Sequence, residues 1–406
     1  MTYCPDCGAA LTRIEVEGRE RSHCPGCQRI QYDQLKVGAG GLIEHEGRLL
    51  LAHRTIPPFE GCWNLPAGYA EADEHPQQTA VREVYEETGL EVEATGLADV
   101  YFTEYFRVYP GSRLNRGILE SVTDNPTGRP VIAQMIGHDI PLLVQTAREL
   151  QRYPIAGVDL NLGCPAPVVY RQCAGGGLLR EPKTVDAILG ALRDALAIPF
   201  TVKTRLGFDS PAVFDELLPL FAKHRIDLLT VHARTVKEMY RSPVRYDAIA
   251  HAVRELPFPV LANGNIHSAA KADDVLRLTG AKGLMIGRGV VRNPWLFQQI
   301  RQHRRGESVF QPTGREVLAY VRELYATAGA PGLPERSQVR RVKKHMNYLG
   351  LGVEPTGEFL DRIRRVTTSA EFFGVCEEFL AHDRPMPLEP FPLALKETDV
   401  VAGEHR

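Results

Sequence analysis

Residues 158–165 read VDLNLGCP, an apolar strand-like run that ends in a polar, glycine-containing edge. The same plan recurs downstream as VKTRLG at Val202–Gly207, TVHART at Thr230–Thr235 and NGNI at Asn263–Ile266. The run that ends in IGRG, at Ile286–Gly289, is the last of the series. Such runs favour an α/β fold in which functional side chains gather at the carboxyl ends of parallel strands.

Strand-like runs alternate with helical or loop segments from residue 100 onward. The seven runs are Val100–Val108, Val131–Ile136, Gly157–Leu162, Phe200–Thr204, Leu228–His232, Val260–Ala262 and Gly283–Ile286. Repeated βα units predict a TIM barrel of the (β/α)8 type. Because such a barrel has eight strands, we expect one that lacks its first strand.

The five edge motifs, in this order and at barrel spacing, resemble those of the tRNA-dihydrouridine synthases over about residues 101–385. The segment YFTEYFRV resembles that family's second strand. We find no counterpart of the Pro-Met-x-Gly-type stretch of its first strand. The resemblance implies an enzyme that binds FMN, takes its electrons from NADPH and reduces uridine in tRNA to 5,6-dihydrouridine.

Reduction of uracil needs a hydride at one ring carbon and a proton at its neighbour, and reduced FMN would supply the hydride. Cys164 lies on a loop after a strand and is the candidate proton donor. A buried apolar filler is the alternative for a single cysteine, but the position at the barrel edge favours the acid. The resemblance implies that Asn161 bonds the uracil edge. Arg205 is expected either to contact the substrate or to form a structural ion pair.

Several residues at the strand ends are expected to hold the flavin. Lys203 would place positive charge near the flavin N1–O2 region, and Gln134 resembles the residue that bonds the ring. His232 would approach the phosphate. Late loops commonly bind phosphate in barrels, so their backbone amides should also contribute: Asn263, Gly264, Asn265, Gly287 and Arg288. The glycines Gly175–Gly177 are expected in a substrate-facing loop or a simple turn.

The N-terminus carries two cysteine pairs, in the pattern C-x2-C-x16-C-x2-C. Two such turns can present four thiolates to one tetrahedral Zn²⁺. We therefore expect a structural zinc ribbon over residues 1–35, with Cys4, Cys7, Cys24 and Cys27 as ligands. The other four of the eight cysteines are scattered, which favours a reducing compartment over a disulfide framework.

Residues 68–90, GYAEADEHPQQTAVREVYEETGL, match the pattern G-x5-E-x7-R-E-U-x-E-E-x-G-U at every defined position. On a helix, the spacing of Glu83, Glu86 and Glu87 places three carboxylates on one face, where hard cations such as Mg²⁺ would offset their repulsion and bridge a diphosphate. A solvated acidic face is the alternative.

This region resembles the Nudix hydrolases that carry an N-terminal zinc ribbon, a group that includes NADH-pyrophosphatase-like enzymes. The resemblance implies that the three glutamates bind the metal and that Arg82 orients Glu83. It covers only about residues 1–100. The runs Val37–Ile43 and Arg48–Ala52 predict two strands around a turn, and Glu91–Ala98 predicts a later one. The strands and helix that should follow are replaced by the barrel segment.

Residues 312–382 are helical in pattern, and one stretch there, SQVRRVKKHMNYLG, is strongly basic. A basic helical face suits a phosphate backbone, whereas a solvated charge run is the alternative. Given the barrel before it, we expect Arg340, Arg341 and Lys344 to bind tRNA.

Composition limits the remaining possibilities. The 406 residues are 44% hydrophobic and 24% charged, with a net charge of −2, so nucleic acid must be met by a local patch. No run of 18 apolar residues occurs. We expect a cytoplasmic monomer that does not enter a membrane.

The complete prediction is an α/β chain: a TIM barrel lacking strand 1 with a C-terminal helical domain, preceded by a zinc ribbon and a partial Nudix α/β fold. The expected boundaries are 1–35, 36–100, 101–308, 309–390 and a tail at 391–406. Two other functions stay open: a Mg²⁺-dependent hydrolase of a nucleoside diphosphate derivative, or a fusion remnant without catalysis. The abrupt junction near residue 100 predicts that both sites are incomplete, with weakened FMN affinity and little hydrolysis.

Overall fold

A computed structural model describes residues 99–125, 127–328 and 333–391. It also describes parts of the N-terminal region: 4, 7, 9–16, 19–28, 30–31, 38–40, 44–45, 48–49, 52–53, 63–64, 67–69, 82 and 84–86. The chain divides into two compact units, Met1–Thr95 with Pro126–Gly128, and Gly96–Asn125 with Arg129–Arg406.

The first unit contains short antiparallel strands. β1 (Thr12–Val16), β2 (Arg19–His23) and β3 (Ile30–Gln31) form one sheet beside the paired cysteines. The remaining strands pair as β4 (Gly38–Gly40) with β9 (Ala67–Tyr69), β5 (Glu44–His45) with β6 (Arg48–Leu49), and β7 (Ala52–His53) with β8 (Trp63–Asn64).

Three expectations for this unit can be compared with its strands and helix. β5 pairs antiparallel with β6, which lies in the run expected at 48–52, and the turn expected between the two runs falls on residues 46–47, outside the described residues. The run expected at 37–43 contributes β4, which pairs with β9 instead of joining that hairpin. Within the glutamate-rich box, Arg82 and residues 84–86 are helical, whereas Glu83, Glu87 and the strand expected at Glu91–Ala98 lie outside the described residues.

The second unit is built around one parallel sheet. Its strands are β10 (Tyr101–Phe102), β11 (Phe106–Arg107), β12 (Val131–Ile136), β13 (Gly157–Leu162), β14 (Phe200–Arg205), β15 (Leu228–His232), β16 (Val260–Asn263) and β17 (Gly283–Met285). The order is β10-β12-β13-β14-β15-β16-β17, and β11 also pairs with β12. β10 and β11 therefore share one position in the sheet, and the seven expected strand positions are confirmed.

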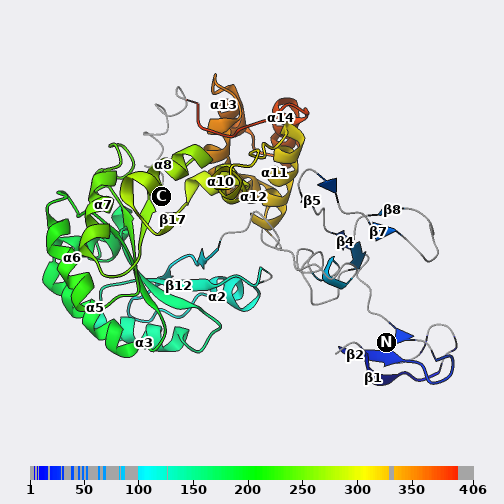
Figure 1. Cartoon of the computed structure of the whole chain (residues 1–406), viewed down its shortest axis with the longest axis horizontal. Coiled ribbons are helices and arrows are strands. Elements are labelled where there is room, and N and C mark those ends of the chain that lie inside the picture. Colours follow the sequence, from blue (N-terminus) through cyan, green and yellow to red (C-terminus); the bar gives the residue numbers. More distant parts are fainter. Residues whose placement is uncertain are drawn as a thin grey trace. The chain divides into compact units, whose positions relative to one another are not determined.

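The sheet is curved but does not close within the part of the chain that the structure describes (Figure 1). β17 pairs there only with β16, and β10 and β11 pair only with β12. The burial of each strand depends on its distance from the open edge of the sheet. β12 and β13 are buried throughout, whereas every residue of the edge strand β17 is partly exposed. In β16, Val260 and Ala262 are buried while Leu261 and Asn263 are partly exposed, so one face is covered and the other is open.

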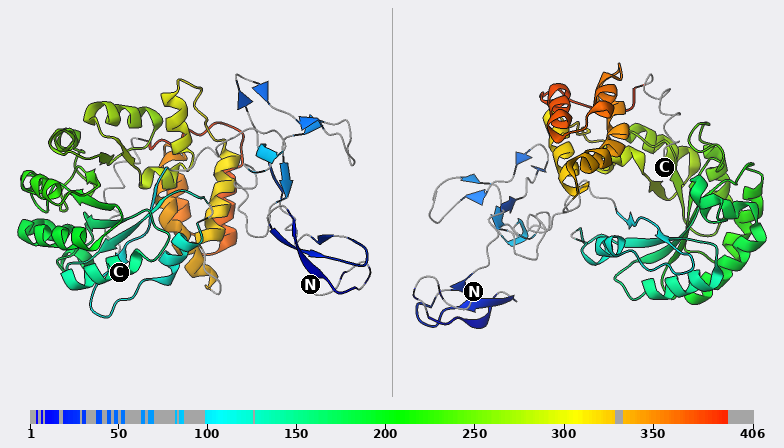
Figure 2. Two further views of the ribbon diagram at one scale, coloured as in Figure 1. Left: turned by 60° about the horizontal axis from the view of Figure 1, so that its bottom comes forward. Right: turned by 180° about the vertical axis from the view of Figure 1, so that it is seen from behind.

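Helices cover the outer face of the curved sheet (Figures 1 and 2). They are α3 (Ile140–Leu150), α5 (Pro182–Ala195), α6 (Val213–Lys223), α7 (Tyr246–Glu255) and α8 (Ala269–Thr279), followed by α9 (Arg288–Arg292) and α10 (Leu296–Arg304). Shorter elements are α2 (Arg116–Thr123), α4 (Pro167–Tyr170) and the 3₁₀ helix η1 (Gly175–Arg180). One core joins the apolar faces of strands and helices, including Leu160, Val202, Leu189 and Phe221.

Local signals explain where these helices begin and end. The Asp139 side chain accepts a hydrogen bond from Leu142 N at the start of α3, and Ser268 caps α8 in the same way. Gly280, at φ 66°, ends α8 in the left-handed conformation that glycine adopts without a steric penalty.

The C-terminal part is a helical domain with its own core. It contains α11 (Gly314–Ala328), α12 (Glu335–Leu349), the 3₁₀ helix η2 (Gly350–Gly352), α13 (Glu358–Arg365) and α14 (Ser369–Leu380). Val342, Met346, Phe359 and Phe372 are central to this core. The helical pattern expected for residues 312–382 is confirmed. None of the described helices has the length and apolar character needed to cross a bilayer.

Candidate active site

The parallel register places the polar strand residues in rows on the inner face of the sheet. Residues paired across neighbouring strands point to the same side. One row contains Gln134, Asp159 and Thr201. The next row contains Asn161, Lys203 and Thr230, and a third contains Arg205, His232 and Asn263. The residues between them face the helices and are mostly apolar.

Hydrogen bonds connect the first two rows to the loop after β13. Asp159 accepts hydrogen bonds from Thr201 Oγ1 at 2.6 Å and from Gln134 Nε2 at 2.8 Å. Asn161 Nδ2 donates to Gln134 Oε1 at 2.8 Å. Asn161 Oδ1 accepts from the backbone N–H groups of Gly163 at 3.0 Å and Cys164 at 2.9 Å. The two predicted ligands, Gln134 and Asn161, are thus in direct contact.

Cys164 lies half-exposed at the end of this network, on the loop after β13. Its side chain packs with Tyr105 in a small apolar cluster. Burial, reinforced by the neighbouring Cys164, raises the pKa of Tyr105. The thiol is therefore partly exposed to solvent and lies close to a phenol.

The glycines after Cys164 form the buried helix η1, which differs from both the loop and the simple turn that we expected. A Cβ on Gly176 would lie 2.9 Å from the Cys164 carbonyl oxygen and 2.5 Å from a Val236 methyl group. The absence of side chains there lets η1 pack directly beneath the Cys164 loop.

Asp159 and Lys203 lie on the inner face with perturbed pKa values. Burial raises the pKa of Asp159 to about 6, although hydrogen bonds from Thr201 and Gln134 oppose the shift. Burial, followed by the charge of Arg205, lowers the pKa of Lys203 to about 8. Both groups are ionised near pH 7, and Lys203 responds to the charge of Cys164 as well as to that of Asp159.

Arg205 ties the Cys164 loop to the loop after β15. Its Nε donates to the Gly163 carbonyl at 2.9 Å, and Nη1 donates to the carbonyls of Thr235 and Met239 at 2.8 and 2.7 Å. Within the part of the chain that the structure describes, Arg205 bonds these carbonyls and forms no ion pair. A guanidinium has five N–H groups, and those of Nη2 make none of these three contacts, although the nearby Tyr240 also interacts with the guanidinium. Its role as a substrate ligand stays a prediction.

Several cations gather at the ends of β14 and β15, where the carboxylates of Asp159 and Glu238 act on Lys203 and Arg234. His232 is buried, and its pKa is strongly lowered by burial and by the positive charges of Arg205, Lys203, Arg234 and Arg288. His232 Nδ1 has no hydrogen-bond partner among the described residues. Burial and the neighbouring Arg288 lower the pKa of Arg234 to about 10. This local field favours an anion.

Tyr240 lies within this cluster of cations. The Arg288 guanidinium carbon lies 4.1 Å from the Tyr240 ring centroid, and that of Arg205 lies 5.3 Å from it. The His232 and Tyr240 rings meet edge to face with centroids 6.0 Å apart. Cations over an aromatic face are attracted by its quadrupole, so the Tyr240 ring helps to hold both guanidinium groups near the carboxyl ends of the strands.

The loop after β16 has the backbone expected of a ligand-facing turn. Gly264 (φ 132°) and Asn265 (φ 49°) both have positive φ. Asn263 Nδ2 donates to the Met285 carbonyl at 2.8 Å, which links this loop to β17. Gly287 and Arg288 follow β17 at the start of α9, and a Cβ on Gly287 would meet nothing within 4 Å.

These features fit an anionic flavin. A phosphate would meet the guanidinium groups and the two late loops, and an electron-rich ring would meet Lys203. The orphaned His232 Nδ1 would gain a partner. The roles of Gln134, Lys203, His232 and the five loop residues remain predictions that these contacts support.

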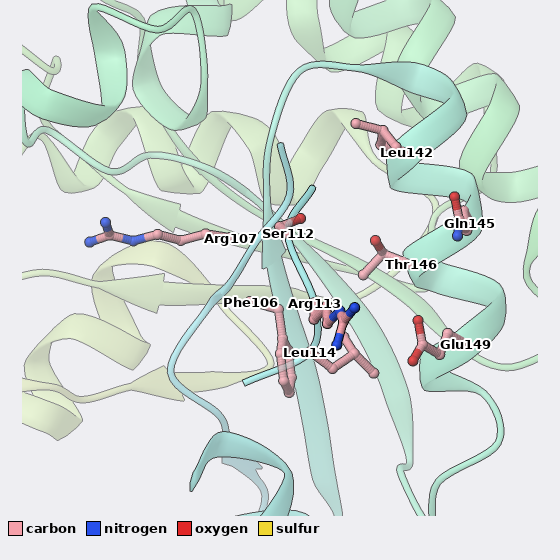
Figure 3. Close-up of a pocket in the computed structure, with 9 residues that line it drawn as sticks. All are labelled: Phe106, Arg107, Ser112, Arg113, Leu114, Leu142, Gln145, Thr146 and Glu149. Carbon is pink, nitrogen blue, oxygen red and sulfur yellow. The ribbon is translucent and has the colours of Figure 1, made fainter. Parts of the chain in front are cut away.

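A small pocket elsewhere is not part of this site (Figure 3). It lies between β11, the following loop and α3, and Gln145, Thr146 and Glu149 lie along one side of that helix. Its volume is about 40 Å³. That space holds about one water molecule, whereas cofactor pockets occupy hundreds of cubic ångströms.

The four N-terminal cysteines are brought together as predicted. Their sulfur atoms all lie within 4.8 Å of one another, with Cys4 and Cys27 3.7 Å apart and Cys7 and Cys24 3.3 Å apart. A tetrahedral ion with Zn–S bonds of about 2.3 Å needs sulfur atoms about 3.8 Å apart. The donor set therefore fits Zn²⁺.

The predicted magnesium ligands are described only in part. Glu86 is exposed and pairs with Arg82 at 2.9 Å, whereas Glu83 and Glu87 lie outside the described residues. Arg82 thus contacts Glu86, and its expected contact with Glu83 stays a prediction.

Sequence reasoning missed four residues of the inner face and its rim. Asp159 and Thr201 lie within strands, where we examined only the ends, yet the alternation in VDLNL and TVKTR places them on the same face as Asn161 and Lys203. Tyr105 and Tyr240 carry no sequence signal, because their contacts with Cys164, Arg205 and Arg288 arise only from tertiary packing.

Comparison with known proteins gives a consistent family. The family model described as "Dihydrouridine synthase (Dus)" matches residues 80–383. A tRNA-dihydrouridine(16) synthase of Neisseria meningitidis is 31% identical over 255 residues, covering 62% of this chain and 77% of that protein. tRNA-dihydrouridine synthase B of Pasteurella multocida is 32% identical over 252 residues, covering 61% and 74%.

A solved Nudix hydrolase from Nitrosomonas europaea is also similar over a short stretch. It is 37% identical, with 26% of this chain and 60% of that protein covered and a TM-score of 0.16. A score this low carries no argument about the fold.

We predict that FMN binding to the flavin-free protein weakens above pH 8. Lys203 is protonated below its pKa of about 8, and only the ammonium can donate charge to the flavin ring. Raising the pH from 7 to 9 should therefore increase the FMN dissociation constant by about tenfold, in proportion to the lost protonated fraction. Titration followed by flavin fluorescence measures this.

The Lys203→Met variant should bind FMN weakly and without this pH dependence. The control, Lys282→Met, at an exposed lysine of the same barrel, should behave like the parent. An equal pH dependence in Lys203→Met would contradict the assignment.

Proposed function

Because this chain belongs to the dihydrouridine synthase family, we propose that it reduces uridine in tRNA to 5,6-dihydrouridine, with Cys164 as the proton donor. The observation that carries the proposal is the placement of Cys164, held by Asn161 at the end of the polar rows and beside the cations of β14. FMN, reduced by NADPH, supplies the hydride when bound.

Cys164 would transfer the proton from its thiol to one carbon of the uracil C5–C6 bond, while the neighbouring carbon takes the hydride. The sulfur then carries a negative charge. Lys203 and Arg205 are close enough for a charge on Cys164 to raise the pKa of each. Their positive charges would stabilise the thiolate until it is reprotonated.

The tRNA would be held in part by α12. Arg336, Arg340 and Lys344 are four residues apart and form an exposed stripe, with Arg341 beside it. These four cations make no ion pair within the described residues, whereas Arg315, Arg322 and Arg362 are paired with Asp383, Glu377 and Glu378. Lys343 differs, since its Nζ donates to the Arg364 and Val366 carbonyls at the end of α13. Unpaired cations are the ones that gain most from a phosphate backbone.

The N-terminal cysteines would hold one structural Zn²⁺. With four thiolates the ion has no open position, so this site would stabilise the ribbon rather than catalyse a reaction. For the Nudix segment we derive no hydrolytic step, because only Glu86 of its three predicted ligands is described.

We predict that Cys164→Ala lowers the rate of uridine reduction by about 10²–10⁴-fold at saturating FMN, because a positioned proton donor is lost. Dihydrouridine formed on a uridine-containing tRNA transcript measures this. Cys173→Ala, at an exposed cysteine nine residues along the chain, is the matched control and should retain the parental rate. Full activity in Cys164→Ala would refute the role of the thiol, and a parent protein inactive with FMN and NADPH would refute the proposed function.

We predict that replacing Arg340, Arg341 and Lys344 together by Gln weakens tRNA binding and reduces its salt dependence. Fewer counterions are released, so the slope of log K against log salt should fall by roughly two to three. The control removes the same charge from the ion-paired positions, as Arg315→Gln, Arg322→Gln and Arg362→Gln. Its slope should change little. Equal effects in both triple variants would show that only net charge matters.

We predict one equivalent of zinc in protein purified without chelator, and its loss in Cys24→Ser. Each thiolate supplies one of four bonds, so three remaining sulfur atoms should bind far more weakly. Elemental analysis measures this, with Cys173→Ser as the control outside the ribbon. Zinc-free parent protein would exclude the site.

A further inference from the structure

The hydrogen bonds beneath the Cys164 loop form an ordered chain in which donor and acceptor are fixed at each step. It begins at the buried carboxylate of Asp159, passes through the side-chain amides of Gln134 and Asn161, and ends on the backbone N–H groups of Gly163 and Cys164. Asp159 has no exposed surface, and Gln134 and Asn161 are both buried. Arg205, at the end of β14, also bonds this loop, through the Gly163 carbonyl.

The direction of this chain follows from its first member. An ionised carboxylate only accepts hydrogen bonds, so Gln134 must turn its NH₂ group toward Asp159 and its oxygen toward Asn161. Asn161 must then turn its NH₂ group toward Gln134 and its oxygen toward the loop. The N–H groups of Gly163 and Cys164 only donate, so both ends of the chain require the same orientation.

This order also decides what remains free for a ligand. Both bonds to Asn161 Oδ1 come from the loop, and one Nδ2 hydrogen is used by Gln134. The one group that Asn161 retains is therefore a single N–H donor. Uracil has two carbonyl acceptors and one ring N–H donor along its edge. Asn161 can thus bond a uracil carbonyl but not the ring N–H.

We propose that Asp159 is a positioning residue whose carboxylate sets the orientation of the Gln134 and Asn161 side chains. In this orientation the oxygen of Asn161 holds the Cys164 loop, and the free N–H of Asn161 is directed toward a uracil carbonyl. The identity of the ligand rests on the proposed function. The order of the hydrogen bonds is a property of the free protein and can be tested without tRNA or flavin.

Two substitutions at Asp159 separate this role from a merely structural one. Asp159→Ala removes the acceptor, so Gln134 and Asn161 can reverse. Asp159→Asn can keep the order, because its oxygen can face Gln134 while its NH₂ group donates to Thr201, whose hydroxyl can also accept. Thr201→Val alone leaves the carboxylate in contact with Gln134 and should keep the order at pH 8, although loss of the Thr201 hydrogen bond raises the Asp159 pKa above its parental value of about 6. Asp159→Asn combined with Thr201→Val leaves the NH₂ group without its acceptor and should lose the order.

The first measurement is residue-resolved amide hydrogen exchange of the flavin-free protein at pH 8. In Asp159→Ala and in the double variant, exchange at Gly163 and Cys164 should accelerate at least severalfold, while Leu160 and Leu162 in the same strand exchange as in the parent. Both single variants, Asp159→Asn and Thr201→Val, should resemble the parent.

The second measurement is kcat for uridine reduction, which should fall by about 10²-fold in Asp159→Ala and be rescued in Asp159→Asn, because a misplaced reacting group costs about that much.

The outcomes distinguish the two proposals. Unchanged exchange at Gly163 and Cys164 in Asp159→Ala, or equal defects in Asp159→Ala and Asp159→Asn, would overturn the positioning role. If Asp159→Ala fails to fold, the double variant decides the same question, since the proposal requires it to be worse than the two single variants combined. A parent protein that shows the expected exchange pattern but reduces no uridine would overturn the proposed function alone.

Discussion

The parallel register of β12 to β16 is the constraint on which the active site depends. In a strand, alternate residues point to opposite faces, and in-register pairing carries this alternation across the sheet. Here it places Asp159 beside Gln134 and Thr201, and Lys203 beside Asn161. A shift of one residue in β13 would bury Leu160 among the polar side chains and turn Asp159 toward the helices. The apolar core on the outer face therefore also fixes the chemistry of the inner face.

The open side of the sheet is the second determinant. Both edges, β17 and the β10–β11 pair, keep unpaired backbone groups within the described structure, and exposed edges are normally closed or covered. The ion pair between Asp99 and Arg301, at 2.6 Å, links the residues before β10 to α10. Both side chains reach solvent, and exposed pairs contribute about 0–1 kcal/mol, so this contact does not replace a strand. The cations and late loops lie on β14 to β17 and the elements after them, and they are assembled although no strand joins β17 to β10 within the described residues.

The sequence was sufficient to predict the parallel α/β sheet, its seven strand positions and the residues at strand ends, because glycine and polar residues interrupt apolar runs there. It was insufficient at Val100–Val108, which we expected to be one strand. Thr103 Oγ1 accepts the hydrogen bond of Gln134 N, so a side chain replaces a backbone carbonyl in the ladder and divides the run into β10 and β11. Such a substitution depends on the partner strand and has no local signature. The contact between Gln134 and Asn161 has no sequence signal for a related reason, since the resemblance implies that Gln134 bonds the flavin and Asn161 the uracil.

The charges on the inner face show how function limits stability here. The pKa of Asp159 is raised from its ordinary value to about 6, so burying this carboxylate costs stability as the pH rises from the unfolded value through 6. The pKa of Lys203 is lowered to about 8, so its burial costs stability as the pH falls from the unfolded value through 8. Between pH 6 and 8 both groups are charged and both costs are present in full. A fold selected only for stability would replace this pair with apolar side chains. Asp159 bonds Gln134, and Lys203 lies beside Asn161, at the only described part of the sheet where a carboxylate, an ammonium and a cysteine loop meet. The destabilised groups are therefore the ones that a flavin and a uracil would need, which agrees with the general finding that local rules are broken at functional sites.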